Sequence, residues 1–352
     1  MPLDHYVTLG RSGLRVSPFC LGAMTFGEEW GFGADARAST EILEFYLGHG
    51  GNFIDTANLY TQGHSESILG EYFARDSARR QRIVLATKFS ANMAPGDPNG
   101  GGANRKSIIA ACEASLRRLR TDYIDLYWQH WEDPFTPVDE TMQALDSLVT
   151  SGKVRYLGFS DTHAWKVATA QLTAQFRGWA PLVALQIEYS LLERTVEGEL
   201  IPMAQALGLG VTPWGPLRSG VLSGKYQRGQ MTAVSQGRAP WVARNDSESV
   251  FGVLDVLAGV AGRRGTTPAR VALAWLLSRP GVASPIIGAR TLEQLKDNLA
   301  ALELQLAPED IGELDRVSAP RFNFPTAFLA NATAQSYAGL TVNGVKFGPS
   351  PR

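Results

Sequence analysis

The chain of 352 residues is 44% hydrophobic and 19% charged, and its 33 Lys and Arg residues balance 34 Asp and Glu residues, for a formal net charge of −1. This composition is typical of a globular protein with a sizeable core, either one large α/β barrel or two smaller domains. The balanced charge, without a long basic run, argues against nucleic acid as a partner and against an electrostatic membrane anchor.

The cysteines and the N-terminus indicate the compartment. Cys20 and Cys112 lie far apart and show no CxxC spacing, so we expect neither a disulfide nor a zinc site, and a reducing compartment fits. The N-terminus lacks the charged and then apolar regions of a signal peptide. No uninterrupted apolar stretch reaches the roughly 18 residues of a transmembrane helix. We therefore expect a cytoplasmic protein without a membrane partner.

Short apolar runs alternate with segments of helical spacing along the chain. Residues 6–17 contain two short runs around a glycine turn, which predicts a β-hairpin. Apolar runs predict buried strands at 19–22, 53–55, 83–88, 123–128, 154–159, 183–187, 209–213 and 283–287. Helical periodicity predicts helices at 38–47, 64–75, 104–119, 137–150, 163–176, 196–207, 248–263, 267–278 and 291–301. A long loop is expected from 214 to about 246.

Eight βα units predict an α/β protein with a (β/α)8 TIM barrel. The barrel core would cover about 18–302 of a single domain spanning 1–352, after the N-terminal hairpin. A doubly wound sheet is the competing interpretation, but no GxGxxG follows the first strand and no GxxxxGK[ST] loop is found. The tail, 306–352, would start with a short helix at 308–317 and continue as a largely irregular extension laid over the barrel.

Charged residues close two neighbouring predicted strands. Asp55 follows the apolar Phe53 and Ile54, and Lys88 ends the next apolar run. An unpaired ammonium is costly at the end of a buried strand, so Asp55 is a candidate partner for Lys88. Tyr60 lies five residues beyond Asp55, and a nearby positive charge would lower the pKa of its phenol. Such a group is a proton donor tuned towards neutral pH.

Barrel enzymes carry their sites at the C-terminal ends of the strands. Most of the residues that those ends present are polar, titratable or aromatic: Met24, Phe26, Asp55, Tyr60, Lys88, Gln129, His130, Trp131, Ser160, Asp161, Gln186, Glu188, Tyr189, Trp214, Gly288 and Arg290. Each of these residues also has a purely structural interpretation, as part of an ion pair, as a core histidine or as a packing aromatic residue. Their coincidence on one predicted face favours function. His5, His49 and His163 are expected off that face, and no His/Cys cluster suggests a metal.

The pattern resembles the aldo-keto reductase family over roughly 6–317. The residues that carry the resemblance are the Asp-x4-Tyr of Asp55 and Tyr60, Lys88, His130, the pair Ser160-Asp161, Gln186, and Ile286-Ile-Gly-Ala-Arg290. The resemblance implies NADPH-dependent reduction of an aldehyde or ketone to an alcohol by reversible hydride transfer. Tyr60 would be the general acid, Lys88 would lower its pKa, and Asp55 would hold Lys88. His130 would orient the carbonyl oxygen.

The resemblance also implies a cofactor site. Ser160, Asp161 and Gln186 would hold the nicotinamide carboxamide, and Trp214 would stack on its ring. Backbone around the pyrophosphate would come from Gly215, Pro216, Leu217, Gly220, Leu222, Gly224 and Lys225. The adenosine 2′-phosphate would lie at a helix start, where free N–H groups and an arginine suit phosphate; the residues there are Gly288, Arg290, Gln294 and Asn298. This set favours NADPH over NADH.

The chain departs from the family pattern in two places. The pair after the fifth strand is more often Ser-Asn, whereas this chain has Ser160-Asp161. An aspartate accepts hydrogen bonds but cannot donate unless it is protonated. The stacking residue is often Tyr, and Trp214 keeps an aromatic face there. Glu293 lies close to Arg290 in sequence and could weaken the preference for a phosphate.

Apolar residues near the same strand ends predict an aromatic substrate pocket: Met24, Phe26, Trp30, Leu59, Phe89 and Trp131. Such a pocket favours a bulky or cyclic carbonyl over a small polar sugar. A regulatory, redox-sensing role remains open, because potassium-channel β subunits share this barrel and cofactor site. A metal-dependent barrel isomerase is disfavoured by the missing cluster of carboxylates and histidines. The oligomeric state is not readable from the sequence.

Overall fold

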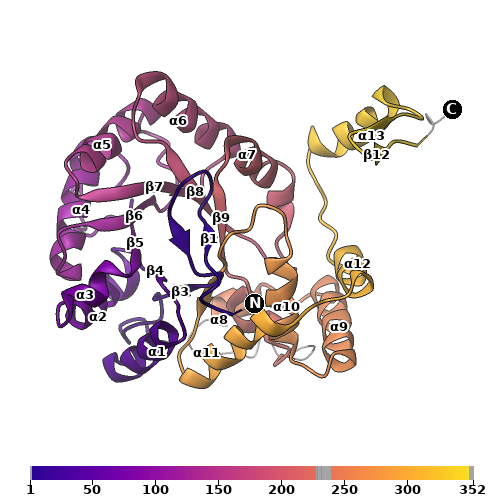
Figure 1. Ribbon diagram of the computed structural model, residues 1–352, viewed down its shortest axis with the longest axis horizontal. Helices are drawn as coiled ribbons and strands as arrows, with labels where there is room; N and C mark the ends of the chain where they lie inside the picture. The colour runs from indigo at the N-terminus through magenta and orange to yellow at the C-terminus, as the bar shows by residue number, and fades with distance from the viewer. Residues whose placement is uncertain (1, 227, 229–230, 232–238, 349–352) are drawn as a thin grey trace.

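Eight parallel strands surrounded by helices form the body of the computed structural model (Figure 1). The structure describes residues 2–226, 228, 231 and 239–348. Part of the predicted loop 214–246 and the last four residues of the predicted tail therefore lie outside the described residues. Among the described residues, no helix is long and apolar enough to cross a bilayer.

The eight strands follow one another in the order β10-β3-β4-β5-β6-β7-β8-β9. Their bounds are β3 (Cys20–Gly22), β4 (Phe53–Asp55), β5 (Val84–Phe89), β6 (Ile124–Gln129), β7 (Val154–Ser160), β8 (Leu182–Glu188), β9 (Gly210–Trp214) and β10 (Ile286–Gly288). A parallel bridge between Val211 and Val282 links β9 to the segment before β10. The predicted (β/α)8 barrel is confirmed. The N-terminal hairpin is also present, as β1 (Val7–Thr8) and β2 (Arg15–Val16).

The helices lie within a few residues of their predicted positions. They are α1 (Ala36–Gly48), α2 (His64–Phe73), α4 (Arg105–Leu119), α5 (Val138–Thr150), α6 (Ala164–Arg177), α7 (Leu200–Leu207), α9 (Glu248–Arg263), α10 (Pro268–Leu277), α11 (Leu292–Leu299) and α12 (Pro308–Val317). Side-chain caps explain several starts: Asn104, Ser247 and Thr267 each accept a backbone N–H of the first helical turn. The sequence did not predict the short α3 (Ser77–Gln81) and α8 (Ala239–Ala243).

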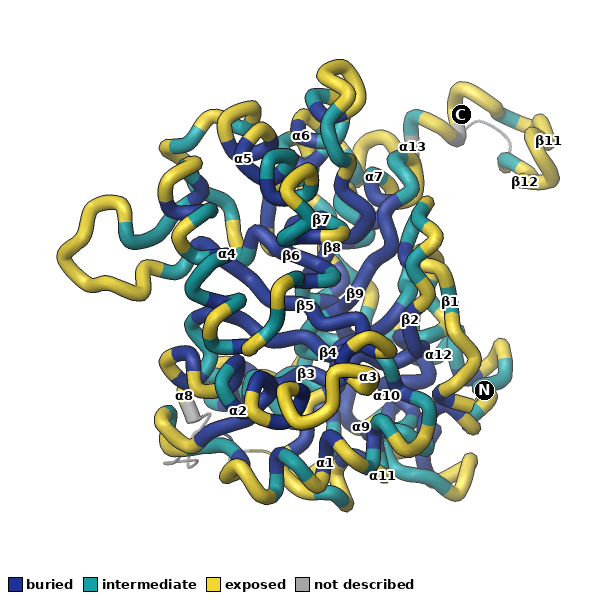
Figure 2. Tube along the Cα trace, turned by 60° about the vertical axis from the view of Figure 1, so that its left-hand side comes forward, coloured by how far each residue is buried: buried dark blue, intermediate teal, exposed yellow. Residues whose placement is uncertain are grey.

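Each strand of the barrel separates two hydrophobic cores. Residues that point outward join the larger core between sheet and helices, as Ile54 and Leu85 do. Residues that point inward, such as Phe53 and Val84, join a smaller core inside the barrel, together with Leu9 and Val16 of the hairpin. This alternation follows from the two-residue period of a strand. Figure 2 shows the strands as the buried centre of the molecule.

The tail differs from its prediction in two ways. Beyond α12 it forms a helix, α13 (Thr326–Ser336), and a small hairpin of β11 (Thr341–Val342) and β12 (Val345–Lys346), so it is not largely irregular. Nor is it laid over the barrel: in Figures 1 and 2 it stands away from it. Most of its described residues are exposed, so little apolar burial holds the tail to its own chain.

Candidate active site

The site residues are the last inward-facing positions of successive strands. Counting by twos from the interior core residues Phe53, Val84 and Leu126 leads to Asp55, Lys88 and His130. The same count along β7, β8 and β9 leads to Ser160, Gln186 and Trp214. The barrel therefore gathers these side chains at the C-terminal end of its interior.

Lys88 lies at the centre of the group and is fully buried. Its ammonium forms an ion pair with Asp55, donates to the Thr56 carbonyl at 2.9 Å, and donates to the Tyr60 hydroxyl at 3.1 Å. Gln186 donates from Nε2 to the second Asp55 oxygen at 3.1 Å. The ammonium therefore has three acceptors, and the Asp55 carboxyl is held from two sides.

The loop that carries Tyr60 is pinned to its surroundings. Thr56 and Asn58 continue the backbone pairing of β4 with β5, through bonds to Ala86 and Lys88 of 2.9 and 3.2 Å. Directly after Tyr60, Thr61 has φ 45° and its hydroxyl donates to the Phe26 carbonyl at 2.8 Å. These contacts fix the loop on both sides of Tyr60.

Burial and Lys88 act in opposite directions on the Tyr60 phenol. Burial raises the pKa of Tyr60 and outweighs the opposing charge of Lys88, so the net pKa lies above its ordinary value. The predicted net lowering is therefore wrong, although Lys88 does pull in that direction. Burial alone would lower the pKa of Lys88, but Asp55 and Tyr60 together outweigh it and the pKa is raised. Lys88 consequently stays protonated.

His130 faces Tyr60 across the site. The two rings meet edge to face with centroids 5.7 Å apart. Burial, with a smaller contribution from Lys88, holds the pKa of His130 well below its usual range, so the imidazole is neutral. Its Nδ1 is buried without a hydrogen-bond partner among the described residues. Because a buried N–H without an acceptor is costly, we assign the proton to Nε2, which makes that nitrogen a donor.

Asp161 is positioned by Trp214. It has φ 42°, and its Oδ1 accepts from the Trp214 indole at 3.0 Å. Asp161 is partly exposed to solvent, but desolvation of its carboxyl by the neighbouring groups raises its pKa to about 6. The neighbouring Ser160 hydroxyl is buried without a partner among the described residues. His163 lines a shallow, open depression together with Asp161 and Trp214, so the expectation that His163 lies off this face is wrong.

The segment after β9 turns repeatedly through left-handed conformations. Gly215, Arg218, Ser219, Gly220 and Gly224 have φ between 46° and 88°. Arg218 also forms an ion pair with Glu188 of β8, a pair that the sequence analysis did not foresee. Successive turns of this kind present backbone N–H groups to anions. This stretch lies beside the Trp214 end of the strands.

The start of α11 is organised by its own side chains. Thr291 caps the helix by accepting from the Gln294 N–H at 3.3 Å. Gln294 accepts from the Arg290 N–H at 2.9 Å, and Asn298 donates to the Gly288 carbonyl at 3.2 Å. Gln294 and Asn298 thus shape the turn, whereas the Arg290 side chain is exposed.

Two predicted pocket residues do not line an open pocket. Phe89 is fully buried against Tyr127 in the outer core, and Phe26 is fully buried in the same core. Phe89 directly follows the inward-facing Lys88, so the two-residue period turns it outward. Met24, Trp30 and Leu59 are half-buried, and Trp131 is exposed.

The structure adds aromatic residues that the sequence analysis missed. Trp30 meets Tyr60 edge to face with ring centroids 6.1 Å apart, and Phe32 lies 6.1 Å from Trp30. Phe32 in turn meets Trp241 of α8 at 5.7 Å. On the other side of Tyr60, the ring of Trp131 lies 4.6 Å from that of His130. A row of aromatic rings therefore extends outward from Tyr60, and its α8 member comes from a helix that sequence periodicity did not indicate.

Residues 18–319 match the model of the aldo/keto reductase family. The chain belongs to this family. An uncharacterized oxidoreductase, YrpG of Bacillus subtilis, is 40% identical to it over 322 residues, which cover 89% of this chain and 95% of the relative. The norsolorinic acid reductase stcV of Emericella nidulans is 37% identical over 341 residues, which cover 95% of this chain and 86% of the relative. An aryl-alcohol dehydrogenase of Pestalotiopsis microspora is 37% identical over 332 residues, which cover 92% of this chain and 85% of the relative.

As an aldo/keto reductase the chain is an NAD(P)H-dependent oxidoreductase, and carbonyl reduction is the general reaction that its relatives support. Members of the family act on small-molecule carbonyl substrates. The described residues contain no group of three or more His, Cys, Asp or Glu side chains that could hold a metal ion.

Proposed function

We propose that this chain is an NADPH-dependent reductase of bulky, cyclic or aromatic aldehydes and ketones, with Tyr60 as its general acid. The observation that carries the proposal is the fully buried Lys88, whose ammonium contacts both Asp55 and Tyr60. When bound, the reduced nicotinamide would supply the hydride. The residues of the chain would bind the carbonyl, polarise it and deliver the proton.

Tyr60 is arranged to give its proton away. The Tyr60 oxygen accepts from Lys88 at 3.1 Å, so its own hydrogen remains free for the oxygen of a carbonyl substrate. Once the proton has left, the ammonium of Lys88 would stabilise the phenolate, which offsets the cost of forming it at a half-buried position. His130 would donate from Nε2 to the same substrate oxygen and orient it.

Several features fit a nicotinamide cofactor. The Ser160 hydroxyl, which has no hydrogen-bond partner among the described residues, the Asp161 carboxyl and the oxygen of the Gln186 amide suit the donors and acceptors of a carboxamide. Trp214 offers a half-buried aromatic face. For the pyrophosphate we propose the backbone between Gly215 and Lys225, which turns through left-handed conformations.

The substrate class rests on the aromatic row next to Tyr60. Planar, apolar groups pack well against such rings. Two relatives have names that refer to norsolorinic acid and to aryl alcohols, which agrees with this choice. The purified enzyme with NADPH should reduce substituted aromatic aldehydes and cyclic ketones with a higher kcat/KM than short hydroxylated aldoses. Equal or better efficiency on aldoses would overturn the substrate class, and no turnover on any carbonyl would favour a regulatory role.

Arg290 tests the preference for NADPH. The exposed arginine at the start of α11 would bind the 2′-phosphate, and a charge-assisted hydrogen bond contributes about 1.5–3 kcal/mol. Arg290→Ala should therefore weaken NADPH binding roughly tenfold to a hundredfold and leave NADH binding unchanged. Titration with each nucleotide, followed by quenching of tryptophan fluorescence, measures both. Glu293→Gln is the matched control and should, if anything, tighten NADPH. An equal loss for both nucleotides would remove Arg290 from the phosphate site.

Asp161 should make the choice between oxidised and reduced cofactor depend on pH. Its pKa is about 6, so the carboxylate is charged above that pH and attracts a positively charged oxidised nicotinamide. Between pH 7.5 and 5.5 the affinity for NADP⁺ relative to NADPH should fall about fivefold. Both forms of the cofactor carry the 2′-phosphate, so protonation of that phosphate changes both affinities equally and does not affect their ratio. Asp161→Asn should show a ratio that does not change over this range; an unchanged slope in the variant would contradict the role.

A further inference from the structure

The C-terminal arm, defined here as residues 319–348, exposes an unusual amount of apolar surface. Its exposed large apolar residues are Phe324, Phe328, Leu329, Tyr337, Leu340, Val342 and Val345. Phe324 is 82% exposed and Phe328 is 61% exposed, and their rings lie 6.1 Å apart. Isolated exposed apolar residues are ordinary, but a cluster of this kind marks an interaction surface.

The arm is too small to be stable by itself. Its helix, α13, has 11 residues, fewer than an isolated helix needs in water, where about 12–15 are still marginal. Its hairpin consists of two strands of two residues each, and an isolated two-stranded hairpin is marginal as well. The secondary structure of the arm therefore calls for a surface on which it can pack.

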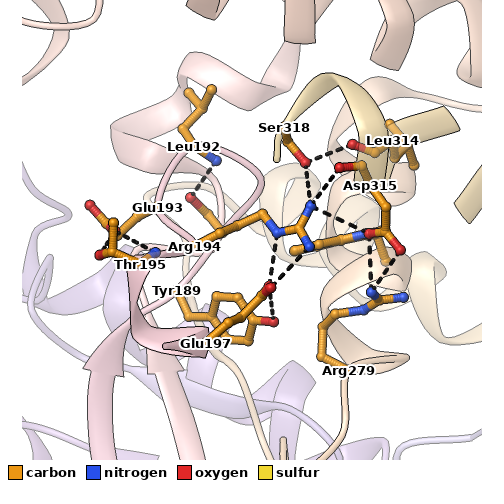
Figure 3. A network of polar contacts seen from close by, with 12 residues as sticks. Tyr189, Leu192, Glu193, Arg194, Thr195, Glu197, Arg279, Leu314, Asp315 and Ser318 are labelled. Atoms are coloured by element: carbon orange, nitrogen blue, oxygen red, sulfur yellow. Dashed lines mark hydrogen bonds and ion pairs between the residues drawn. The ribbon is translucent and has the colours of Figure 1, made fainter. Parts of the chain in front are cut away.

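A network of polar contacts holds the root of the arm, as Figure 3 shows. Arg194 donates to the Asp315 carbonyl at 3.0 Å and to the Ser318 hydroxyl at 2.9 Å, while Glu197 binds its other nitrogens at 2.8 and 3.0 Å. Asp315 also accepts from the Trp275 indole at 2.8 Å. Arg194 is only 9% exposed, so this network ties the end of α12 to the barrel. The arm begins at a fixed point and extends away from its own barrel (Figure 1).

A second unpartnered apolar surface lies on α6. Trp165, Leu172 and Phe176 are 65%, 44% and 86% exposed, and their spacing of seven and four residues places them on one face of the helix. The exposed Thr169 lies on the same face. We call these residues the α6 stripe. Large apolar side chains on the outer face of a barrel helix have no role in the barrel core.

We propose that the arm of one copy of this chain packs on the α6 stripe of a second copy. Both surfaces carry few charged residues, and all of these are basic: Arg321 and Lys346 in the arm, and Lys166 and Arg177 in α6. A scarcity of charged residues is typical of interface centres. In a two-fold dimer both arms would be exchanged, so that both surfaces of each chain are covered.

The assembly is tested first by mass. Multi-angle light scattering after size-exclusion chromatography should show the full chain as a dimer at micromolar concentration. The arm variant Phe328→Glu/Leu329→Glu and the stripe variant Trp165→Glu/Phe176→Glu should both be monomers. These side chains are exposed, so the circular dichroism of the monomers should match that of the wild type. Met93→Glu, at an exposed apolar residue outside both surfaces, is the matched control and should remain a dimer. A monomeric wild type would overturn the proposal.

Cross-linking tests the pairing of the two surfaces. Chains carrying Leu329→Cys are mixed with chains carrying Phe176→Cys under mild oxidation, and a disulfide-linked heterodimer should form. The native Cys20 and Cys112 are buried and should not compete. If the arm variant is monomeric while no heterodimer forms and the stripe variant remains a dimer, the arm binds elsewhere and the assignment to α6 is wrong. Neither test requires turnover, so the inference stands or fails separately from the proposed reaction.

Discussion

Tyr60→Phe should lower kcat for carbonyl reduction by about 10²- to 10⁴-fold, the usual contribution of a general acid. The substitution removes only the hydroxyl that accepts from Lys88 at 3.1 Å and leaves the ring that meets Trp30 and His130. Binding of NADPH should therefore change little. Steady-state kinetics with an aromatic aldehyde, together with a fluorescence titration of NADPH, separate the two effects.

The pH dependence of the same variant gives a second readout. Because burial raises the pKa of Tyr60, the phenol carries its proton throughout the neutral range, and wild-type reduction should decline only in alkaline solution. Tyr60→Phe should lose that alkaline decline along with its activity. As a control, Tyr6→Phe alters an exposed tyrosine whose hydroxyl donates to the Gly50 carbonyl, and it should leave the kinetics unchanged. Full turnover by Tyr60→Phe would refute Tyr60 as the acid.

Lys88→Met should affect both activity and stability. Asp55 would remain buried opposite an apolar side chain, and removing one partner of a buried ion pair costs about 3–5 kcal/mol. The Tyr60 phenolate would also lose its adjacent cation, so turnover should fall by at least about 10²-fold. Urea unfolding and steady-state kinetics measure the two losses.

A double variant distinguishes the structural role of Lys88 from its chemical role. In Asp55→Asn/Lys88→Met no charge remains in the buried pair, and Gln186 can still donate to the oxygen of the Asn side chain. The double variant should therefore recover most of the stability lost by Lys88→Met, while its activity stays low. Recovery of activity together with stability would mean that Lys88 serves the fold alone.

Much of the fold could be predicted from the sequence because the periodicity of each element lies in neighbouring residues. The apolar runs that predict strands and the 3.6-residue spacing that predicts helices require no knowledge of the partner elements. The strand period even indicates which side chains point inward: it places Lys88 inside the barrel and its neighbour Phe89 outside. Applied throughout, that rule would have removed Phe89 from the predicted pocket. Phe26 lies in a loop beyond its strand, where no such period operates.

The sequence by itself determined the order of eight βα units, the composition of their two faces, and the residue types that the strand ends present. Only the tertiary structure decided how those residues act on one another. Gln186 bonds to Asp55 across 131 positions of the chain, and no local pattern indicates that contact. The net pKa of Tyr60 depends on how completely packing excludes water from the phenol, which opposes the charge of Lys88. The root of the C-terminal tail is likewise held by long-range contacts from Arg194 to Asp315 and Ser318, which no local pattern indicates.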